Sequence, residues 1–280
     1  MGLGDYLQLD FVQHALIAGA LVAIICGLIS PFVITRRAAF AVHGTAELSF
    51  TGAAAGLVVA NDAVGGAFIG SIVVAAAIGL LSVRERERDS AIGVILAFGL
   101  GVGLWLLQYY HGYTNAAVGI LFGQIFGVSN DQIWLLLGVA GAVLVAMTLL
   151  YRPLLFASVD PDVAEARGVR VRMVGLAFLV VLALTVTAAA QIVGTLLVLS
   201  LAITPAAAAQ RLSARPAVVT GLSIVFALAA SVGGLIASLE TPSVRASVWI
   251  TAISFGIYVV ARVAGARVLV ARRRPVPVAA

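Results

Sequence analysis

Lysine is absent from this chain of 280 residues, and its 17 basic residues are all arginine. Without lysine, the chain contains neither the phosphate-binding loop G-x-x-x-x-G-K-[ST] nor a lysine that could form a Schiff base. The hydrolase motifs H-E-x-x-H and G-x-S-x-G are missing as well. We therefore predict that the chain is not an enzyme and that any ATP that powers it is bound by a separate subunit.

Cysteine occurs once, at Cys26. A single cysteine excludes a disulfide within the chain and any metal site made of cysteines alone. A metal bound here would need nitrogen and oxygen ligands, which argues against a soft ion such as Cu(I). Cys26 itself lies in a long apolar segment, and we expect it to be a small, packed side chain.

Charged residues make up only 10% of the chain, compared with about a quarter of an ordinary soluble domain, and 62% of the residues are apolar. Uncharged runs recur that are long enough for helices to cross about 30 Å of hydrocarbon. The period-2 alternation of a membrane β-barrel is absent, so the backbone must satisfy its hydrogen bonds as helix. The sequence predicts an all-α, polytopic helical membrane protein, which we place in a bacterial inner membrane.

The arginines are unevenly distributed, and short arginine-rich loops mark the cytoplasmic side of a membrane protein. This distribution, rather than nucleic-acid binding, accounts for the net charge of +5. It predicts one transmembrane domain over residues 1–280, with the N-terminus outside, the C-terminus cytoplasmic and about nine transmembrane helices. The arginine-rich connections lie near 36–37, 84–88, 152–172, 211–215 and 267–274. The expected spans are 11–35, 44–61, 64–82, 91–110, 131–150, 173–190, 193–210, 216–238 and 246–267.

The longest hydrophilic segment runs from Arg152 to Arg172. Within it, Asp160 has the character of a helix N-cap, Pro161 suits the first helical position, and Gly168 suits a left-handed C-cap. These signals predict a helix of about two turns outside the membrane. On pattern alone, an ordinary capped loop helix and a helix that docks on a partner explain the residues equally well.

Two ionisable residues mark the start of the second expected span, with Glu47 inside it and His43 directly before it. His43 and Glu47 are four residues apart, so they lie on one face of a helix and could share one ligand. A carboxylate near the bilayer midplane costs about 2.5 kcal/mol or more unless it is paired or ligated. We favour a functional site over a simple hydrogen-bonded pair. One imidazole and one carboxylate suit Zn²⁺, Mn²⁺ and Fe²⁺ almost equally.

Several blocks of sequence occur together in a characteristic order. They are Tyr151-Arg152-Pro153-Leu154-Leu155, Asp160-Pro161-x-x-Ala164 with Gly168, Gln191-x-Val193-Gly194-x-Leu196-Leu197-Val198 and Pro205-Ala206-Ala207-x-Ala209. This pattern resembles the metal-ion permeases of ATP-binding-cassette importers, which take up zinc, manganese or iron. The segments from Leu121 to Ser129 and from Leu239 to Ser243 are similar to that family too, so the resemblance covers nearly the whole chain.

The resemblance implies a function and a set of partners. It implies a homodimer that moves a divalent metal inward, with ATP-binding-cassette ATPase subunits and an extracytoplasmic metal-binding protein. The helix near 160–168 would be the coupling helix that inserts into the ATPase, with Asp160, Pro161, Ala164 and Gly168 at the matching positions. No cofactor would be bound by this chain itself, and ATP would be held by the partner subunit.

The resemblance also bears on the two ionisable residues. Family members carry a G-D-A-x-S-H type block after paired basic residues, and the Asp and His of this block contact the metal. Counting back from Gly52, His43 falls at the Asp position and Glu47 at the His position, while Thr51 stands where proline is usual. The ligand types are thus kept with their order reversed. The resemblance implies that His43 and Glu47 form the metal site where two copies of this span approach each other.

Other possibilities stay open at this point. A permease for a siderophore or a corrinoid would share the coupling helix without needing His43 or Glu47. A gradient-driven secondary transporter would use Glu47 as an ion relay and would need no ATPase. His14 and His111 carry no assignment, residues 113–130 are expected to form an interfacial or re-entrant helix, and Pro205 is expected to kink or break the seventh span.

Overall fold

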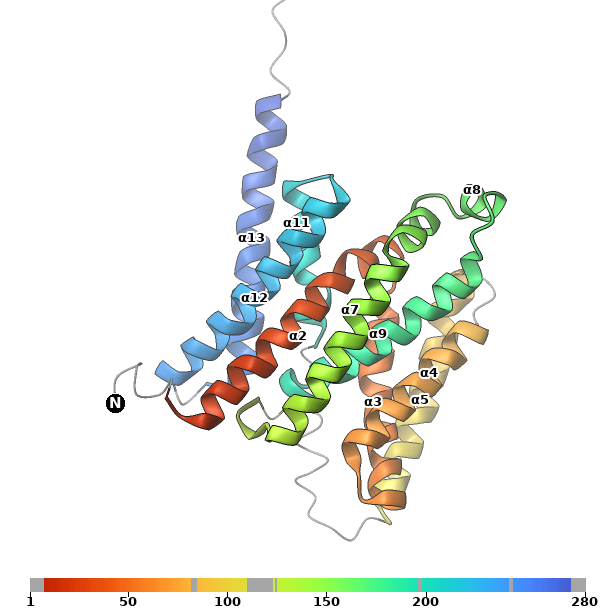
Figure 1. Cartoon of the computed structure of the whole chain (residues 1–280), viewed down its shortest axis with the longest axis vertical. Coiled ribbons are helices and arrows are strands. Elements are labelled where there is room, and N and C mark those ends of the chain that lie inside the picture. Colours follow the sequence, from red (N-terminus) through yellow and green to blue (C-terminus); the bar gives the residue numbers. More distant parts are fainter. Residues whose placement is uncertain are drawn as a thin grey trace, which may run out of the picture.

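The computed structural model describes residues 8–81, 85–109, 123, 125–195, 198–241 and 244–272, and this part of the chain is helical without any strand. Figure 1 shows the helices as a bundle of long, tilted rods. The long helices are α2 (Asp10–Thr35), α3 (Ala39–Ala60), α4 (Ala63–Leu81), α5 (Glu85–Leu107), α7 (Asn130–Val159), α9 (Val171–Val193), α12 (Pro216–Glu240) and α13 (Ala246–Arg272). The short ones are η1 (Ile125–Gly127), α8 (Pro161–Ala166), α10 (Val198–Ala202) and α11 (Thr204–Leu212).

The expected all-α membrane fold is confirmed. Within the described residues, seven helices are long and apolar enough to cross a membrane, namely α2, α4, α5, α7, α9, α12 and α13. Helix α3 has 22 residues but carries His43 and Glu47, which lower its hydropathy. The expected span 193–210 is divided into α10 and α11. The total of nine crossings stays a prediction.

Several helix boundaries differ from the expected ones. Helix α3 begins at Ala39 rather than at residue 44, because α2 and α3 are joined by only three residues. Helix α7 continues to Val159, past Pro153, where the expected span ended at 150. Its start is set by a capping box, in which Ser129 and Gln132 each bond the other's backbone N–H. Capping residues therefore mark the start of α7 in the sequence. Composition does not predict that α7 continues beyond its apolar part to Val159.

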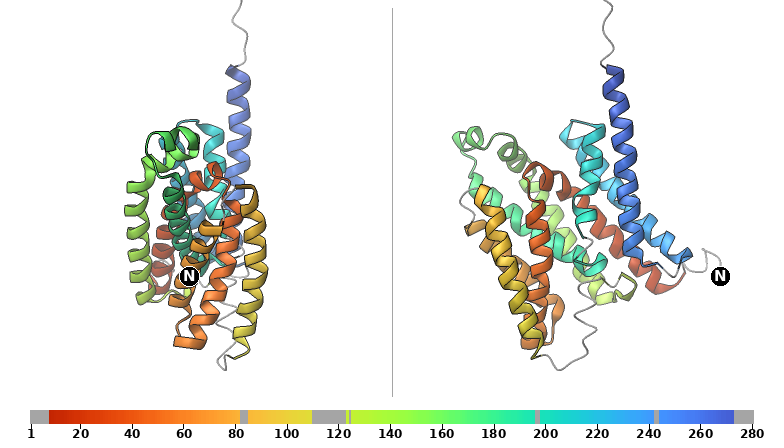
Figure 2. Two further views of the ribbon diagram at one scale, coloured as in Figure 1. Left: turned by 90° about the vertical axis from the view of Figure 1, so that its right-hand side faces the viewer. Right: turned by 180° about the vertical axis from the view of Figure 1, so that it is seen from behind.

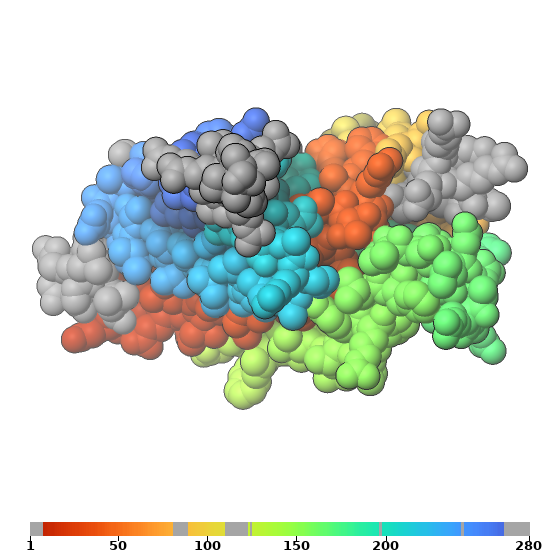
Figure 3. All heavy atoms as spheres, turned by 90° about the horizontal axis from the view of Figure 1, so that it is seen from above, coloured from red at the N-terminus to blue at the C-terminus, as the bar shows by residue number. Residues whose placement is uncertain are grey.

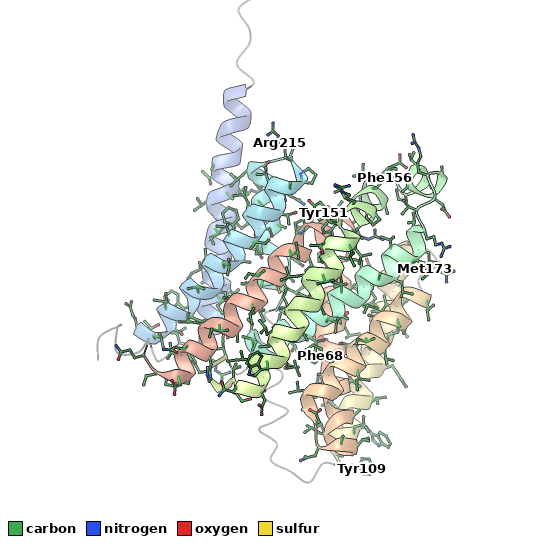
Figure 4. All side chains as sticks on the ribbon, viewed as in Figure 1. Phe68, Tyr109, Tyr151, Phe156, Met173 and Arg215 are labelled. Atoms are coloured by element: carbon green, nitrogen blue, oxygen red, sulfur yellow. The ribbon has the colours of Figure 1, made fainter. Side chains whose placement is uncertain are left out.

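Several of the described arginine-rich segments gather at one end of the bundle. Helix α8 and the C-terminal ends of α11 and α13 lie at the upper end in Figure 1. Figure 4 shows Arg215 at this end and Tyr109 at the opposite one. Seen from the upper end, atoms of α3 reach the surface between α11 and the α7–α8 region (Figure 3). The orientation in the membrane, with the arginine-rich end in the cytoplasm, stays a prediction.

Helix α9 lies at the centre and contacts α2, α3, α4 and α7. On one side of it α2 packs along α12 and α7, and on the other side α3 packs between α4 and α5. Figure 2 shows α5 and α7 on opposite faces of the molecule, with α3 next to α10 in the view from behind. The large side chains Ile25, Ile29, Phe178 and Leu182 are at most 1% exposed and fill the centre.

Glycines bring α3 and α4 into direct backbone contact. A Cβ atom placed on Gly66 would lie 2.5 Å from the carbonyl oxygen of Gly52 and 2.6 Å from the Cα atom of Gly56. Apolar side chains gain nothing by leaving lipid, so small residues that allow close packing are what holds membrane helices together. Helix α3 is thereby fixed against α4 along its outer half.

We predict that Gly66→Ala destabilises the protein, because its new methyl group would press on the α3 backbone. The expected loss is about 1–3 kcal/mol in the free energy of unfolding. Thermal unfolding of the purified protein in detergent would measure it. The matched control is Gly101→Ala on α5, where a Cβ atom meets nothing within 4 Å. Equal melting temperatures for the two variants would contradict the proposed close contact.

Candidate functional site

A tight turn sets where the candidate metal ligands lie. Helix α2 ends at Thr35. Two residues later, Arg37 adopts a left-handed conformation with φ 51°, and the Ala38 N–H donates to the Val33 carbonyl at 2.8 Å. Such a conformation costs a non-glycine residue roughly 1–2 kcal/mol. Helix α3 then begins at once, at Ala39. Glu47 is consequently about 12 Å along α3 from its start, at a rise of 1.5 Å per residue.

The expected one-turn pairing of the two ionisable side chains is present. His43 Nε2 lies 3.2 Å from Glu47 Oε1. Both side chains occupy the partly open line of α3, with 33% and 16% of their surface exposed. Neighbouring positions such as Val42 and Ala46 are fully buried. The pair therefore faces outward from this single chain, while the adjacent positions of α3 face the interior.

The imidazole has one ring nitrogen to spare. Nδ1 of His43 is buried and has no hydrogen-bond partner. Imidazole nitrogens are common metal ligands, but an ion could reach the buried Nδ1 only if the ring turned. Within the described residues, no cluster of three or more His, Cys, Asp or Glu side chains could hold an ion. If His43 and Glu47 bound an ion, one copy of the chain would offer two ligands, and Zn²⁺ usually takes four.

The capping signals predicted for the hydrophilic segment are confirmed. Asp160 Oδ1 accepts from the Val163 N–H at 3.0 Å, and Pro161 opens α8. Gly168 has φ +85°, and the Val169 N–H donates to the Ala164 carbonyl at 3.0 Å. Ala164 is fully buried, while the other residues of α8 are exposed. The result is a short, rigid helix that projects from the ends of α7 and α9 (Figure 1).

The predicted break near Pro205 is confirmed, and serines from two distant helices satisfy it. Ser30 Oγ on α2 donates to the Ile203 carbonyl at 3.3 Å and accepts from the Ala206 N–H at 3.4 Å. Ser254 Oγ on α13 donates to the Ser200 carbonyl at 2.9 Å. No local pattern predicts these contacts, because Ser30 and Ile203 are 173 positions apart. The first part of the broken segment, α10, contacts α3.

The remaining candidates stay separate from the pair. His14 lies half-buried near the start of α2, and Cys26 is fully buried, as expected. His111 lies outside the described residues, as does most of 113–130, of which 125–127 form the short helix η1. Gly123 lies against the end of α9, where a Cβ atom would be 2.6 Å from the Gly194 nitrogen. Two glycines of the family-like blocks therefore meet in space.

Comparison with known proteins places this arrangement in a family. Residues 8–265 match the model of the ABC 3 transport family. The chain belongs to that family. A manganese transport system membrane protein, MntC, from Halalkalibacterium halodurans is 34% identical over 82% of this chain and 79% of its own length. The manganese import system permease protein ScaB of Streptococcus parasanguinis is 32% identical over 68% of each chain.

A solved structure supports the same assignment. A chain of PsaBC from Streptococcus pneumoniae, determined in complex with a Fab, superimposes with a TM-score of 0.82 at 28% identity. The match covers 92% of this chain and 94% of that one. As an ABC 3 family member, the chain is a multi-pass inner-membrane transport subunit, and ATP hydrolysis belongs to a separate subunit. Both predictions from the sequence are thereby confirmed.

We predict that this family member needs the Asp160 cap in order to work with its ATPase. Asp160→Ala removes the acceptor for the Val163 N–H, which costs about 1 kcal/mol of helix stability and frays α8. Asp160→Asn keeps an acceptor and should preserve function. Co-purification of the ATPase subunit and its stimulated ATP hydrolysis would measure the effect.

Asp162→Ala is the matched control for this experiment. It removes the same charge from the exposed first turn of α8 and leaves the cap bond in place. If Asp162→Ala and Asp160→Ala were equally impaired, local charge and not the cap would be responsible. A wild-type phenotype for Asp160→Ala would contradict a role for the cap.

Proposed function

We propose that the chain is the permease subunit of a manganese importer, and that His43 and Glu47 contact the ion as it passes. The proposal is supported chiefly by the 3.2 Å His43–Glu47 pair on the partly open line of α3. It is also supported by relatives named as manganese transport proteins, at 34% and 32% identity. In this family the transported ion is the substrate, so its ligands must bind it and release it again.

The ligand chemistry fits a borderline or hard divalent ion. An imidazole nitrogen and a carboxylate oxygen suit Mn²⁺, Zn²⁺ and Fe²⁺, and no thiolate is present to favour a soft ion. Mn²⁺ lies at the weak end of the affinity order of the first-row divalent metals. A site with few protein ligands therefore holds Mn²⁺ only briefly, as inward release requires. Zinc is the second candidate, since the same two ligands would bind it more tightly.

The functional unit that we propose is a homodimer. His43 and Glu47 keep 33% and 16% of their surface open in the single chain, although the adjacent Val42, Ala46 and Leu48 are at most 1% exposed. A second copy that approaches this line would bring a second imidazole and a second carboxylate to the same ion. Four protein ligands would complete a tetrahedral Zn²⁺ site. They would leave two positions of an octahedral Mn²⁺ site to water.

The proposed transport cycle couples this site to ATP. An extracytoplasmic metal-binding protein would deliver the ion to the outer end of the bundle, and the paired His43 and Glu47 would hold it. Closure of the ATPase subunits would then move α8, whose exposed surface and buried Ala164 suit a docked helix that is anchored to the bundle. The protomers would change their packing, and the ion would leave toward the cytoplasm.

We predict that His43→Ala and Glu47→Ala each lower manganese uptake at least about tenfold, as expected when about 1.4 kcal/mol of ion binding is lost. Cells that express the permease with its ATPase and binding protein would be assayed for Mn²⁺, Zn²⁺ and Fe²⁺ content. His14→Ala is the control, because this histidine lies near the start of α2, apart from the pair. Undiminished uptake of all three metals by both site variants would refute the proposed site.

The same cells distinguish the alternative transporters. A permease for a metal chelate would take up the chelate and leave free Mn²⁺ unchanged, with no dependence on His43. A secondary transporter would lose uptake when a protonophore collapses the proton gradient and would keep it when the ATPase is inactive. The proposed importer shows the opposite dependence, so an inactive ATPase abolishes uptake.

The homodimer has its own test. Native mass spectrometry of the purified complex should find two permease chains with two ATPase subunits, because the site is complete only with both copies. Co-expression of tagged Glu47→Ala and untagged wild-type chains should then give mixed dimers with reduced uptake. A complex with a single permease chain, or full uptake by mixed dimers, would contradict the shared site.

A further inference from the structure

One cationic side chain joins three helices at the arginine-rich end of the bundle. Arg36 is the C-cap residue of α2 and directly follows Thr35. Its Nη1 atom lies 3.4 Å from Ser158 Oγ near the end of α7. Its guanidinium carbon lies 5.8 Å from the ring centroid of Phe178 on α9. This distance is within the range of a cation–π interaction. Arg36 therefore contacts both helices that flank α8.

Aromatic rings extend the same contact into the core. Phe32, one turn before Arg36, meets Tyr151 of α7 edge-on, with ring centroids 5.5 Å apart at 89°. Phe32 also lies 6.4 Å from the Phe178 ring. Phe32 and Phe178 are 3% and 1% exposed. Figure 4 places Tyr151 on the upper part of α7, next to α2. We refer to Phe32, Arg36, Tyr151 and Phe178 as the inner cluster.

The backbone of α9 leaves room for the guanidinium. Gly175 is one turn before Phe178, and a Cβ atom there would lie 3.1 Å from Arg36 Nη2. That distance is tighter than an ordinary van der Waals contact, so even a methyl group would press on the arginine. The guanidinium is thus seated closely against α9, in addition to its contact with α7.

The inner cluster lies between the proposed coupling helix and the proposed metal site. Ser158 precedes the α8 cap Asp160 by two residues. Helix α9 follows α8 in the chain, and Phe178 lies about two turns after its start. On the other side, Arg36 precedes His43 by seven residues. The intervening turn is short and fixed by the bonds of Arg37 and Ala38 to α2. A displacement of α2 at this point must therefore displace the start of α3.

We propose that Arg36 is a positioning residue that transmits movement of α8, through α7 and α9, to the His43–Glu47 segment of α3. The inference rests on the proposed function. A push on α8 moves the ends of α7 and α9 together, and the guanidinium holds the end of α2 to both. Without it, the two helices slide past α2, and ATP is hydrolysed without a matching change at α3.

The test is the ratio of Mn²⁺ transported to ATP hydrolysed. The complete complex with its ATPase and binding protein would be reconstituted in proteoliposomes. We expect Arg36→Ala to keep ATP hydrolysis and to lower the ratio about fivefold or more, the usual range for a lost coupling interaction. A purely structural role would lower both activities in parallel with the amount of folded complex and leave the ratio unchanged.

Conservative variants keep the proposal falsifiable if Arg36→Ala fails to assemble. Arg36→Lys retains the charge but loses the planar guanidinium, so its ratio should lie between those of wild type and Arg36→Ala. Phe178→Leu removes the ring face and should lower the ratio in the same way. The double variant Arg36→Lys/Phe178→Leu should be less than additive, because both changes act on one contact.

The controls separate this inference from the proposed function. Arg215→Ala removes an exposed positive charge at the same end of the bundle and should leave the ratio unchanged. Unchanged ratios in Arg36→Lys and Phe178→Leu, with Mn²⁺ transport that depends on Glu47, would overturn the role of Arg36 and keep the importer. If the wild-type complex moved Zn²⁺ instead of Mn²⁺, the metal assignment would fail, and the ratio measured with Zn²⁺ would still test Arg36.

Discussion

A peptide backbone in hydrocarbon has no water to bond, and this constraint shapes the rest of the molecule. It makes the described chain helical throughout, and it makes every interruption expensive. The break between α10 and α11 is the clearest case. There, the hydroxyls of Ser30 and Ser254 take the place that water would have in a soluble protein. The irregular segment next to α3 is possible because two neighbouring helices bond its backbone.

The same constraint explains how much of the fold could be predicted from the sequence. Uncharged length alone locates most of the spans, because a membrane helix needs about 20 apolar residues. Local chemistry is equally readable, as the Asp160 cap, the left-handed Gly168 and the break at Pro205 show. The start of α3 was predicted five residues too late, since a hydropathy pattern cannot show that Arg37 and Ala38 form a compact turn.

Contacts between distant segments are the part that the sequence could not provide. The spacing of His43 and Glu47 predicts their 3.2 Å pairing, because both lie on one helix and the geometry is local. No comparable signal relates Ser30 to Ile203, or Arg36 to Ser158 and Phe178, since those pairs meet only after the helices pack. The proposed metal site is a further case, because half of its ligands would come from a second copy, and local spacing carries no information about contacts between chains.

The arrangement of the two candidate ligands also suits transport better than storage. Glu47 has the imidazole of His43 as a partner, so the carboxylate is not left alone in an apolar setting. An entering ion would have to compete with that internal contact, which would weaken its net binding. Because Nδ1 is buried, an ion that enters from the open line would meet Nε2 and Oε1 only as their contact is given up. A small shift of α3 that restores the internal pair would therefore favour release, and the inner cluster lies where such a shift would begin.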